Sequence, residues 1–312
     1  RPAWTDKRVQ FDANYEPIVA EGKIFLASPA NHSVSAFDLK SGRVEWRVYV
    51  DAPIRFAPTY WQGRLYFGAD DGCVYCLTAN TGKEIWKFSA APSPRMAIGN
   101  ERLISVWPVR TGTVIKDGKL YFTAGVWPFE GTMLYELDAT SGQELRSIDL
   151  DDQSPQGYLA ANESRLFIPG GRSRAFIVDF ESGNRIPFSY DSKGLTDYHV
   201  VASDDHLFHG DRAFAFKHSG DQPLPEPELS ADRPVLRDDV VYYAGKRAPA
   251  FEGEVVTDYE LHASKMTEVE KVDRRGRSFQ TKTAQPYWKL EGVPIHQVHA
   301  MGGETIYAHY GN

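Results

Sequence analysis

Several loop segments of this chain combine arginine, tryptophan, glutamine and histidine, which are residue types that could bind a ligand. The segments span residues 52–60, 105–114, 154–161 and 196–203, with a Trp-Pro turn at residues 127–131 beside them. Cations next to aromatic rings suit a flat anionic ligand or a sugar. The alternative is that these loops only pack against one another. The residues of this predicted ligand site are Arg55, Trp107, Arg110, Trp127, Gln156 and His199.

Metal and redox chemistry have weaker support. Cys73 and Cys76 have CxxC spacing, but Leu77 stands where a c-type haem needs histidine, and no second Cys pair exists for zinc. The segment reads as a strand, where residues three apart point to opposite faces, so we expect two separately packed cysteines. The same spacing splits His206 from His209. We therefore predict no metal site and no catalytic residue.

Composition excludes several other classes. The chain has 312 residues, a net charge of −7 and a pI near 5.8, which argues against a nucleic-acid-binding protein. Its 42 % apolar content is that of a folded protein. The sequence contains no apolar run of about 18 residues, so no transmembrane segment is predicted. It has no P-loop, dinucleotide fingerprint or Gly-x-Ser-x-Gly elbow.

An internal repeat must position these residues. Residues 17–50 and 58–90 align with a period of 41, and an apolar-aromatic pair such as Ile24-Phe25 or Leu65-Tyr66 recurs along the chain. Each copy reads as four short strands joined by tight turns, which predicts an all-β propeller of four-stranded antiparallel blades. We expect one propeller domain over residues 1–312, with units near 17–50, 58–90, 112–150, 157–191, 198–220, 234–292 and 298–312.

A motif within the repeat resembles that of a known protein family. Ala36-x-Asp38-x-x-Ser41-Gly42-x-x-x-Trp46 resembles the tryptophan-docking repeat of propellers of the pyrroloquinoline quinone (PQQ) type. The resemblance implies a structural role for these residues: the Trp lies across the neighbouring blade, the Gly permits the turn and the Asp bonds turn amides. Trp288 and Trp4 look like further fourth-strand tryptophans whose upstream motif is lost or displaced. The matching positions in later copies are Gly82, Trp86, Asp138 and Gly142.

The resemblance also sets expectations about size and location. It implies about seven blades, with eight as the alternative. Six units are nearly complete and a seventh only begins, so we favour a piece of a longer protein over a short last blade. The chain is similar to the front part of large exported bacterial propellers. This similarity predicts a periplasmic, outer-membrane-associated or extracellular protein.

Two kinds of relative suggest different functions. Quinoprotein dehydrogenases hold calcium through Glu and Asn, use a catalytic Asp and commonly carry a disulfide of adjacent cysteines. No such set can be matched in this chain. The outer-membrane barrel-assembly propeller has the repeats without the quinone. We therefore expect a non-catalytic binding or scaffold module, without a cofactor, for a protein partner or a small anionic or sugar ligand. The alternative is a PQQ- and calcium-dependent dehydrogenase of alcohols or sugars, or the propeller part of a larger enzyme.

Overall fold

A computed structural model describes most of the chain. It covers residues 16–99, 102–171, 173–186, 198–209, 212–216, 224–246, 259–272, 276, 278–302 and 305–310. Trp4 and the unit ends at 187–191 and 217–220 lie outside these described residues. The described part contains β-strands and one 3-10 turn but no α-helix, and no helix in it could cross a membrane. The predicted all-β fold is therefore confirmed.

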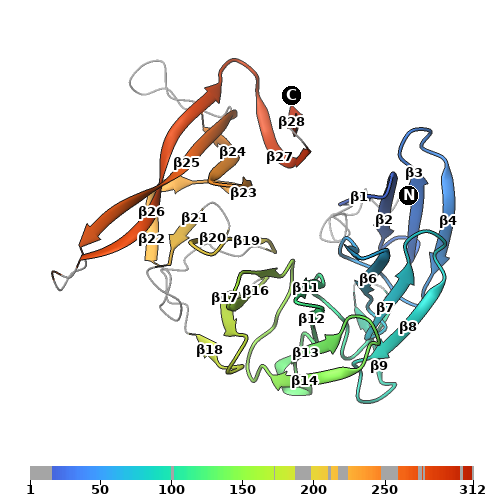
Figure 1. Ribbon diagram of the computed structural model, residues 1–312. Helices are drawn as coiled ribbons and strands as arrows, with labels where there is room; N and C mark the ends of the chain where they lie inside the picture. The colour runs from blue at the N-terminus through green and yellow to red at the C-terminus, as the bar shows by residue number, and fades with distance from the viewer. Residues whose placement is uncertain are drawn as a thin grey trace. The chain divides into compact units, whose positions relative to one another are not determined.

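The chain divides into two compact units. Unit 1 comprises residues 1–159 and 168–175, and unit 2 comprises residues 160–167 and 176–312. Each unit is built from antiparallel sheets in which the strands follow one another in sequence order, as the labels in Figure 1 let the reader trace.

The described residues of unit 1 form three complete four-stranded sheets and an inserted hairpin. The first sheet is β1 (Ile18–Ala20), β2 (Lys23–Ser28), β3 (Ser33–Asp38) and β4 (Val44–Tyr49). The second is β5 (Thr59–Trp61), β6 (Arg64–Gly68), β7 (Cys73–Thr78) and β8 (Glu84–Ser89). The third is β11 (Val114–Lys116), β12 (Lys119–Ala124), β13 (Met133–Asp138) and β14 (Glu144–Asp149). The hairpin of β9 (Met96–Gly99) and β10 (Arg102–Ser105) precedes the third sheet, which also carries the 3-10 turn η3 (Pro128–Glu130).

The boundary between the units passes through the fourth sheet, and the later sheets belong to unit 2. The fourth sheet is β15 (Ala160–Ala161), β16 (Arg165–Gly170), β17 (Ser173–Asp179) and β18 (Arg185–Ile186). The fifth is β19 (Val200–Ala202), β20 (His206–His209), β21 (Arg212–Ala215) and β22 (Leu224–Ser230). The sixth is β23 (Asp232–Arg237), β24 (Val240–Lys246), β25 (Tyr259–Val272) and β26 (Ser278–Leu290), and β27 (Ile295–Gly302) pairs with β28 (Thr305–Tyr310).

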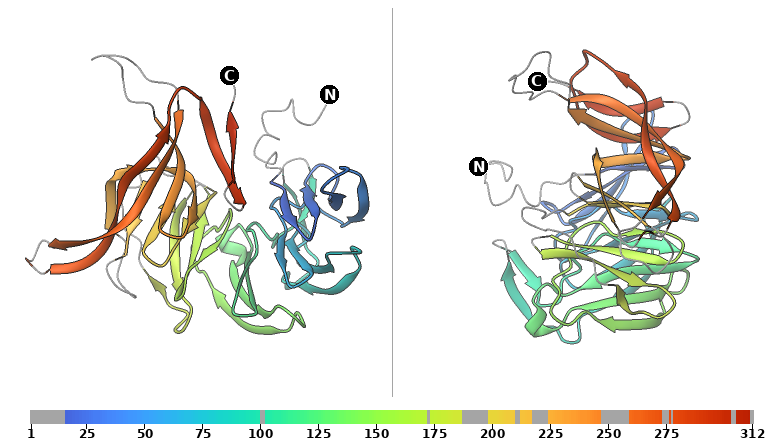
Figure 2. Two further views of the ribbon diagram at one scale, coloured as in Figure 1. Left: turned by 45° about the horizontal axis from the view of Figure 1, so that its top comes forward. Right: turned by 90° about the vertical axis from the view of Figure 1, so that its left-hand side faces the viewer.

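In unit 2, one sheet ends later than predicted and another carries a long hairpin. The fifth sheet continues to Ser230, beyond the predicted end at residue 220, because β22 begins only at Leu224. In the sixth sheet, β24 pairs with β25 only as far as Lys265. The rest of β25 pairs with β26 alone, so this hairpin extends well past its sheet, as Figure 2 shows.

Tight turns explain why the first two strands of the blades in unit 1 pair closely. Both central residues of the first turn have positive φ, with Glu21 at 50° and Gly22 at 72°. Asp117 and Gly118 repeat this geometry at 52° and 75°. Two left-handed residues in succession form the type I′ turn, which matches the twist of a β-hairpin. The predicted polar-Gly turns are therefore present.

Tryptophan rings connect neighbouring sheets of unit 1. The indole N–H of Trp46 in β4 donates to the Ala79 carbonyl oxygen of the second sheet at 3.0 Å. A Cβ atom on Gly82 would lie only 2.7 Å from the Trp46 ring, so glycine is needed where the ring rests. Trp86 repeats the contact on the third sheet, with its N–H 3.3 Å from the Ala139 oxygen and its ring against Gly142.

The aspartates of the same motif stabilise the turn that precedes each fourth strand. Asp38 Oδ1 accepts hydrogen bonds from the Ser41 backbone N–H at 2.7 Å and from Ser41 Oγ at 2.6 Å. Asp138 bonds Ser141 in the same way. These short local bonds fix the turn between the third and fourth strands, which in turn places each tryptophan.

The two cysteines lie in separate parts of the core. Both are buried in β7 and free of disulfide. Cys73 packs with Val34 and Phe67, whereas Cys76 packs with Leu120 and Phe122 from the third sheet. Burial raises the pKa of each thiol to about 11. The prediction of two separately packed cysteines is confirmed.

Candidate functional site

A buried carboxylate joins two of the predicted site arginines. Asp70 is fully buried in the turn between β6 and β7. Its Oδ2 lies 2.6 Å from Arg55 Nη2 and 2.7 Å from Arg55 Nε, and its Oδ1 lies 2.8 Å from Arg110 Nε. The Arg55 side chain is 6 % exposed and that of Arg110 is 14 % exposed. One aspartate therefore neutralises one of two guanidinium groups in a water-poor setting.

The backbone around Asp70 explains this arrangement. Its N–H donates to the Pro53 carbonyl in the Arg55 loop at 2.9 Å, and its carbonyl accepts from the Ser105 N–H at 2.7 Å. The Val109 N–H donates to the Ala69 carbonyl at 3.1 Å. The turn thus binds the loop before the second sheet on one side and the loop before the third sheet on the other.

A third predicted loop joins the same cluster. The Gly157 N–H donates to the Arg110 carbonyl oxygen at 3.0 Å, and the Tyr158 hydroxyl accepts from the Ala57 N–H at 2.9 Å. Tyr158 also packs edge-on against Phe56. Three of the four predicted loops of the ligand site therefore meet within unit 1.

Two more cationic or titratable groups lie beside the cluster. Arg102 Nη1 in β10 lies 2.6 Å from His32 Nε2 and 3.4 Å from the Ala30 carbonyl oxygen. Burial lowers the pKa of His32, and the Arg102 charge lowers it further. Burial also lowers the pKa of Arg55; Asp70 opposes this shift and Arg110 adds to it. Arg55 and Arg110 share the single carboxylate of Asp70, so these three side chains together carry one net positive charge.

The predicted tryptophans have mainly packing roles. Trp107 is buried, and its indole N–H donates to the Glu130 carbonyl oxygen at 2.7 Å. The Trp127 carbonyl accepts from the Glu130 N–H at 2.9 Å, so both Trp-Pro segments meet at η3. The Arg95 guanidinium lies over the Trp107 ring and forms a two-point ion pair with Glu130 at 2.7 and 2.9 Å.

Gln156 and His199 are not among the described partners of the Asp70 side chain. Gln156 donates its backbone N–H to the Pro169 oxygen at 3.0 Å and its side-chain amide to Ser154 Oγ at 3.3 Å. His199 is half-buried next to β19 in unit 2. The described partners of the Asp70 side chain are Arg55 and Arg110. A ligand role for the six predicted residues stays a prediction.

Asp70 is the residue that sequence reasoning missed. An Ala-Asp-Asp-Gly stretch is typical of a solvated turn, so its composition gives no reason to expect a buried charge. The signal that could have found it is the uninterrupted apolar run Leu65–Gly68 just before it, which continues into the buried Ala69 and Asp70. A charged residue at the end of a fully buried strand needs a buried partner.

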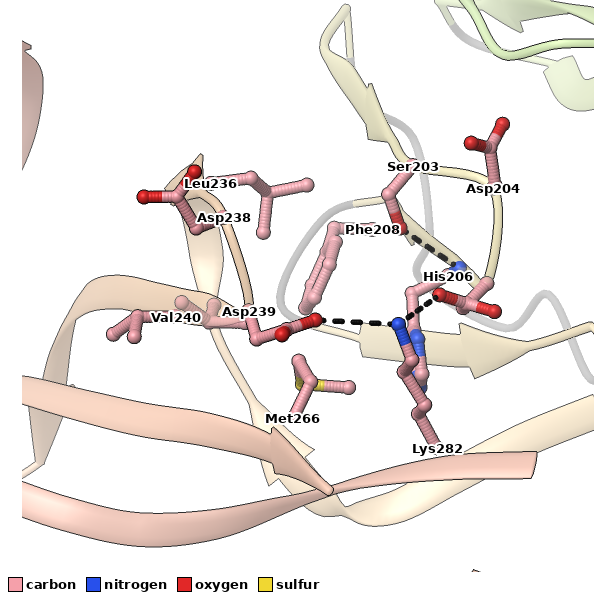
Figure 3. A pocket seen from close by; sticks show the side chains of 12 residues that line it. Ser203, Asp204, His206, Phe208, Leu236, Asp238, Asp239, Val240, Met266 and Lys282 are labelled. Atoms are coloured by element: carbon pink, nitrogen blue, oxygen red, sulfur yellow. Dashed lines mark hydrogen bonds and ion pairs between the residues drawn. The ribbon is translucent and has the colours of Figure 1, made fainter. Parts of the chain in front are cut away.

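A pocket lies in unit 2 between two turns and the long hairpin. Its volume is about 210 Å³. Lys282 of β26 points into it, with Nζ 3.1 Å from Asp205 Oδ2 and 3.2 Å from Asp239 Oδ1 (Figure 3). Phe208, Leu236 and Met266 supply apolar lining. Lys282 therefore already pairs with two of the pocket's carboxylates and fastens the hairpin to the turns below it.

The residues around Asp70 do not fit a flat quinone in their present arrangement. PQQ is a planar polycarboxylate that needs open ring faces and unpaired cations. Here Arg55 and Arg110 are paired with Asp70, and Trp107 is buried under Arg95. Among the described residues, no three His, Cys, Asp or Glu side chains are grouped so that they could hold a metal ion.

Repeated four-stranded sheets, type I′ turns and tryptophans resting on glycines define a β-propeller of the PQQ-like repeat class. The PQQ_2 family model, described as outer membrane protein assembly factor BamB, matches residues 2–217. The chain belongs to this family.

Curated relatives match over shorter stretches. The chain is 29 % identical over 101 residues to the dehydrogenase subunit of a quinone alcohol dehydrogenase from Gluconacetobacter polyoxogenes, covering 29 % of this chain and 13 % of the relative. It is 25 % identical over 142 residues to a polyvinylalcohol dehydrogenase from a Pseudomonas species, covering 45 % of this chain and 20 % of the relative. The chain thus spans at most a fifth of these relatives.

Solved structures show the same fold. BamB from Moraxella catarrhalis aligns with a TM-score of 0.55 at 11 % identity, covering 93 % of this chain and 76 % of BamB. The computationally designed Ika8 protein aligns with a TM-score of 0.51 at 11 % identity, covering 86 % of this chain and 70 % of Ika8. The BamB and quinoprotein relatives are exported bacterial proteins.

Proposed function

We propose that this chain is a non-catalytic binding and scaffold module of the PQQ-like propeller class that holds a protein partner in the bacterial periplasm or at the outer membrane. The single observation that carries the proposal is the pairing of Arg55 and Arg110 with Asp70. This pairing uses the predicted ligand-binding cations to join three loops. The family membership and the export of its relatives agree with this role.

A second candidate function has a specific observation in its favour. The local identity to quinone alcohol dehydrogenases favours a PQQ-dependent dehydrogenase, or a propeller segment of one. In that case the loops around Asp70 would have to rearrange to free an aromatic face and a cation for the quinone. The buried pairs described above make such a rearrangement costly.

One assay separates the two candidates. The purified chain is titrated calorimetrically with PQQ and calcium, and then tested for dye reduction with simple alcohols and aldose sugars, with a quinoprotein alcohol dehydrogenase as the positive control. We expect neither saturable heat nor turnover. Turnover that requires both PQQ and calcium would overturn the non-catalytic function and favour the dehydrogenase.

A further inference from the structure

A histidine contacts the arginine at the tip of the inserted β9–β10 hairpin. Arg102 is the first residue of β10 and lies opposite Gly99, on the same inner face of the hairpin as the buried Ile104. Its guanidinium reaches the Ala30 carbonyl oxygen at 3.4 Å and His32 Nε2 at 2.6 Å, both in the turn between β2 and β3. Among the described residues, no carboxylate pairs with Arg102. The imidazole ring therefore carries the closest contact between the hairpin tip and the first sheet.

The chemistry of this contact determines the protonation state of the ring. A guanidinium group has N–H donors and no acceptor, so His32 Nε2 must accept the hydrogen bond from Arg102 through its lone pair. In a neutral imidazole the other ring nitrogen then carries the proton, and the ring also bonds the Asp51 backbone. A protonated ring has two N–H donors and no acceptor, and it would place a second positive charge against the guanidinium. Only neutral His32 can therefore keep the contact.

The backbone of the β2–β3 turn positions the ring. His32 has a φ of 53°, in the left-handed region that residues with a side chain seldom adopt. Its carbonyl oxygen accepts from the Val50 N–H at 2.9 Å, and the Asn31 N–H donates to Ser28 Oγ at 3.2 Å. Residues in such a conformation persist where their surroundings determine it, and they cluster at ligand clamps and switch regions. The turn therefore fixes the backbone from which the ring reaches Arg102.

The charges around the ring favour its neutral form while the hairpin is in place. Burial lowers the pKa of His32 and the Arg102 charge lowers it further, whereas the backbone hydrogen bond and the Asp70 charge oppose this shift. The Asp70 carboxylate is itself shared by Arg55 and Arg110, which offsets its effect on the ring. Loss of the Arg102 contact would remove one of the two causes that lower the pKa of His32. Proton binding and hairpin position are therefore linked.

We propose that His32 is a proton-controlled switch for the β9–β10 hairpin: the neutral ring holds Arg102 and the hairpin tip on the first sheet, and protonation releases the tip. The base of the hairpin stays attached, because the Ser105 N–H donates to the Asp70 carbonyl oxygen at 2.7 Å. Docking of the tip is strongest above the ordinary histidine pKa of 6.5 and weakens as the pH falls from there through the lower pKa of the docked ring. Release uncovers the inner face that carries Ile104. This switch depends neither on the identity of the partner nor on quinone binding.

Two measurements on the full chain test the switch. The first is an NMR titration of ring-labelled histidines, in which the His32 signal is assigned by its loss in His32→Gln. The second is hydrogen exchange of the hairpin peptide followed by mass spectrometry at about pH 5 and about pH 7.5, corrected for the intrinsic pH dependence of exchange. We expect the His32 pKa to lie below its ordinary value. Protection of the hairpin should fall with the same titration, by about tenfold for every pH unit that separates the docked and free pKa values of the ring.

Variants separate the switch from general effects of acid. His32→Gln offers an acceptor that does not titrate, and His32→Asn suits the left-handed backbone, so both should remove the pH dependence of hairpin exchange. Arg102→Gln should raise the His32 pKa towards its ordinary value. The matched control is His309→Gln, an exposed histidine of β28 in unit 2, which should change neither measurement. A His32 pKa that does not respond to Arg102→Gln, or a pH dependence that persists in both His32 variants, would overturn the switch.

Discussion

Asp70 joins the loops that precede the second and third sheets of unit 1. A fully buried carboxylate is costly to desolvate, and it persists here because two guanidinium groups pair with it. The same residue supplies backbone bonds to the loops on both sides. The pair therefore acts as a structural joint, and its removal leaves two buried cations without a counter-charge.

Replacing this carboxylate gives the first prediction. Asp70→Asn should lower the free energy of unfolding by about 3 to 5 kcal/mol, because Arg55 and Arg110 stay buried with their charges uncompensated. Urea denaturation followed by circular dichroism measures the change. The control Asp117→Asn alters an aspartate whose side chain is 76 % exposed and should shift stability by less than about 0.5 kcal/mol. Equal effects of the two variants would contradict the structural role of Asp70.

The site was only partly predictable from sequence for a reason visible at this residue. Arg55 and Arg110 stand out as cations in loops, and the repeat correctly places their loops side by side. Which group pairs with them depends on the burial of Asp70, and that burial comes from packing between sheets. Local composition cannot distinguish the fully buried Asp70 from its neighbour Asp71 in the same turn, whose side chain keeps 9 % of its surface exposed.

The motif aspartates give a pH-dependent prediction. Hydrogen bonds from the backbone and side chain of Ser141 hold the pKa of Asp138 below its ordinary value of about 3.9. A depressed folded-state pKa contributes stability above the ordinary value, and that contribution is lost as the pH falls through the folded-state pKa. Ser141→Ala removes one donor and should raise the pKa of Asp138 part of the way.

Carboxyl chemical shifts recorded over an acid titration test this expectation. Ser182→Ala is the matched control, because Ser182 makes the same two bonds to Asp179 in the fourth sheet. That control should move Asp179 and leave Asp138 unchanged. An Asp138 titration that does not respond to Ser141→Ala would show that the backbone bond alone sets its pKa.

At the scale of the strand, the fourth-strand position that Trp46 occupies in the first sheet shows how the sheets differ in packing. Trp46 lies opposite Ala36 and Trp86 lies opposite Cys76, so the large ring always faces a small residue. Trp288 follows the same pattern opposite Ala263 in the sixth sheet. In the third sheet Arg146 replaces the tryptophan and pairs with Glu136 at 2.8 Å. This position therefore holds a tryptophan ring in the first, second and sixth sheets and an ion pair in the third.

The glycines under the tryptophan rings provide an element-scale prediction. Gly42 and Gly82 have nearly equal φ values of 67° and 69°, but only a Cβ on Gly82 would collide with a ring. Gly42→Ala should cost about 1 kcal/mol of stability for the left-handed backbone alone. Gly82→Ala should cost about 2 to 4 kcal/mol, because the Trp46 ring must also move.

Urea denaturation of both variants measures the difference. The tryptophan emission of the chain should shift in Gly82→Ala, where the Trp46 ring must move, and stay unchanged in Gly42→Ala. Equal costs would mean that the ring does not rest on this glycine.

The fold itself was predictable because such positions recur: turn glycines and tryptophans appear at fixed spacing. The end of β22 and the length of the β25–β26 hairpin could not be predicted from the sequence, because neither follows the repeat.

At the scale of the whole molecule, cooperativity follows from how strongly neighbouring sheets are joined. In a repeat fold, stability is approximately a sum over sheets and their interfaces. Unit 1 has two tryptophans, each of which bonds a carbonyl and covers a glycine of the next sheet. The single tryptophan of unit 2, Trp288, is 39 % exposed, and its ring lies tilted against Tyr242 of its own sheet.

We therefore predict that unit 2 unfolds at lower urea concentration than unit 1. In a Trp288→Phe variant the remaining tryptophans all belong to unit 1, so fluorescence reports on that unit alone. Circular dichroism should then show two steps and fluorescence only the later one. The control Trp61→Phe keeps Trp288, so its fluorescence should retain a small early step. Coincident circular dichroism and fluorescence curves in both variants would contradict the lower stability of unit 2.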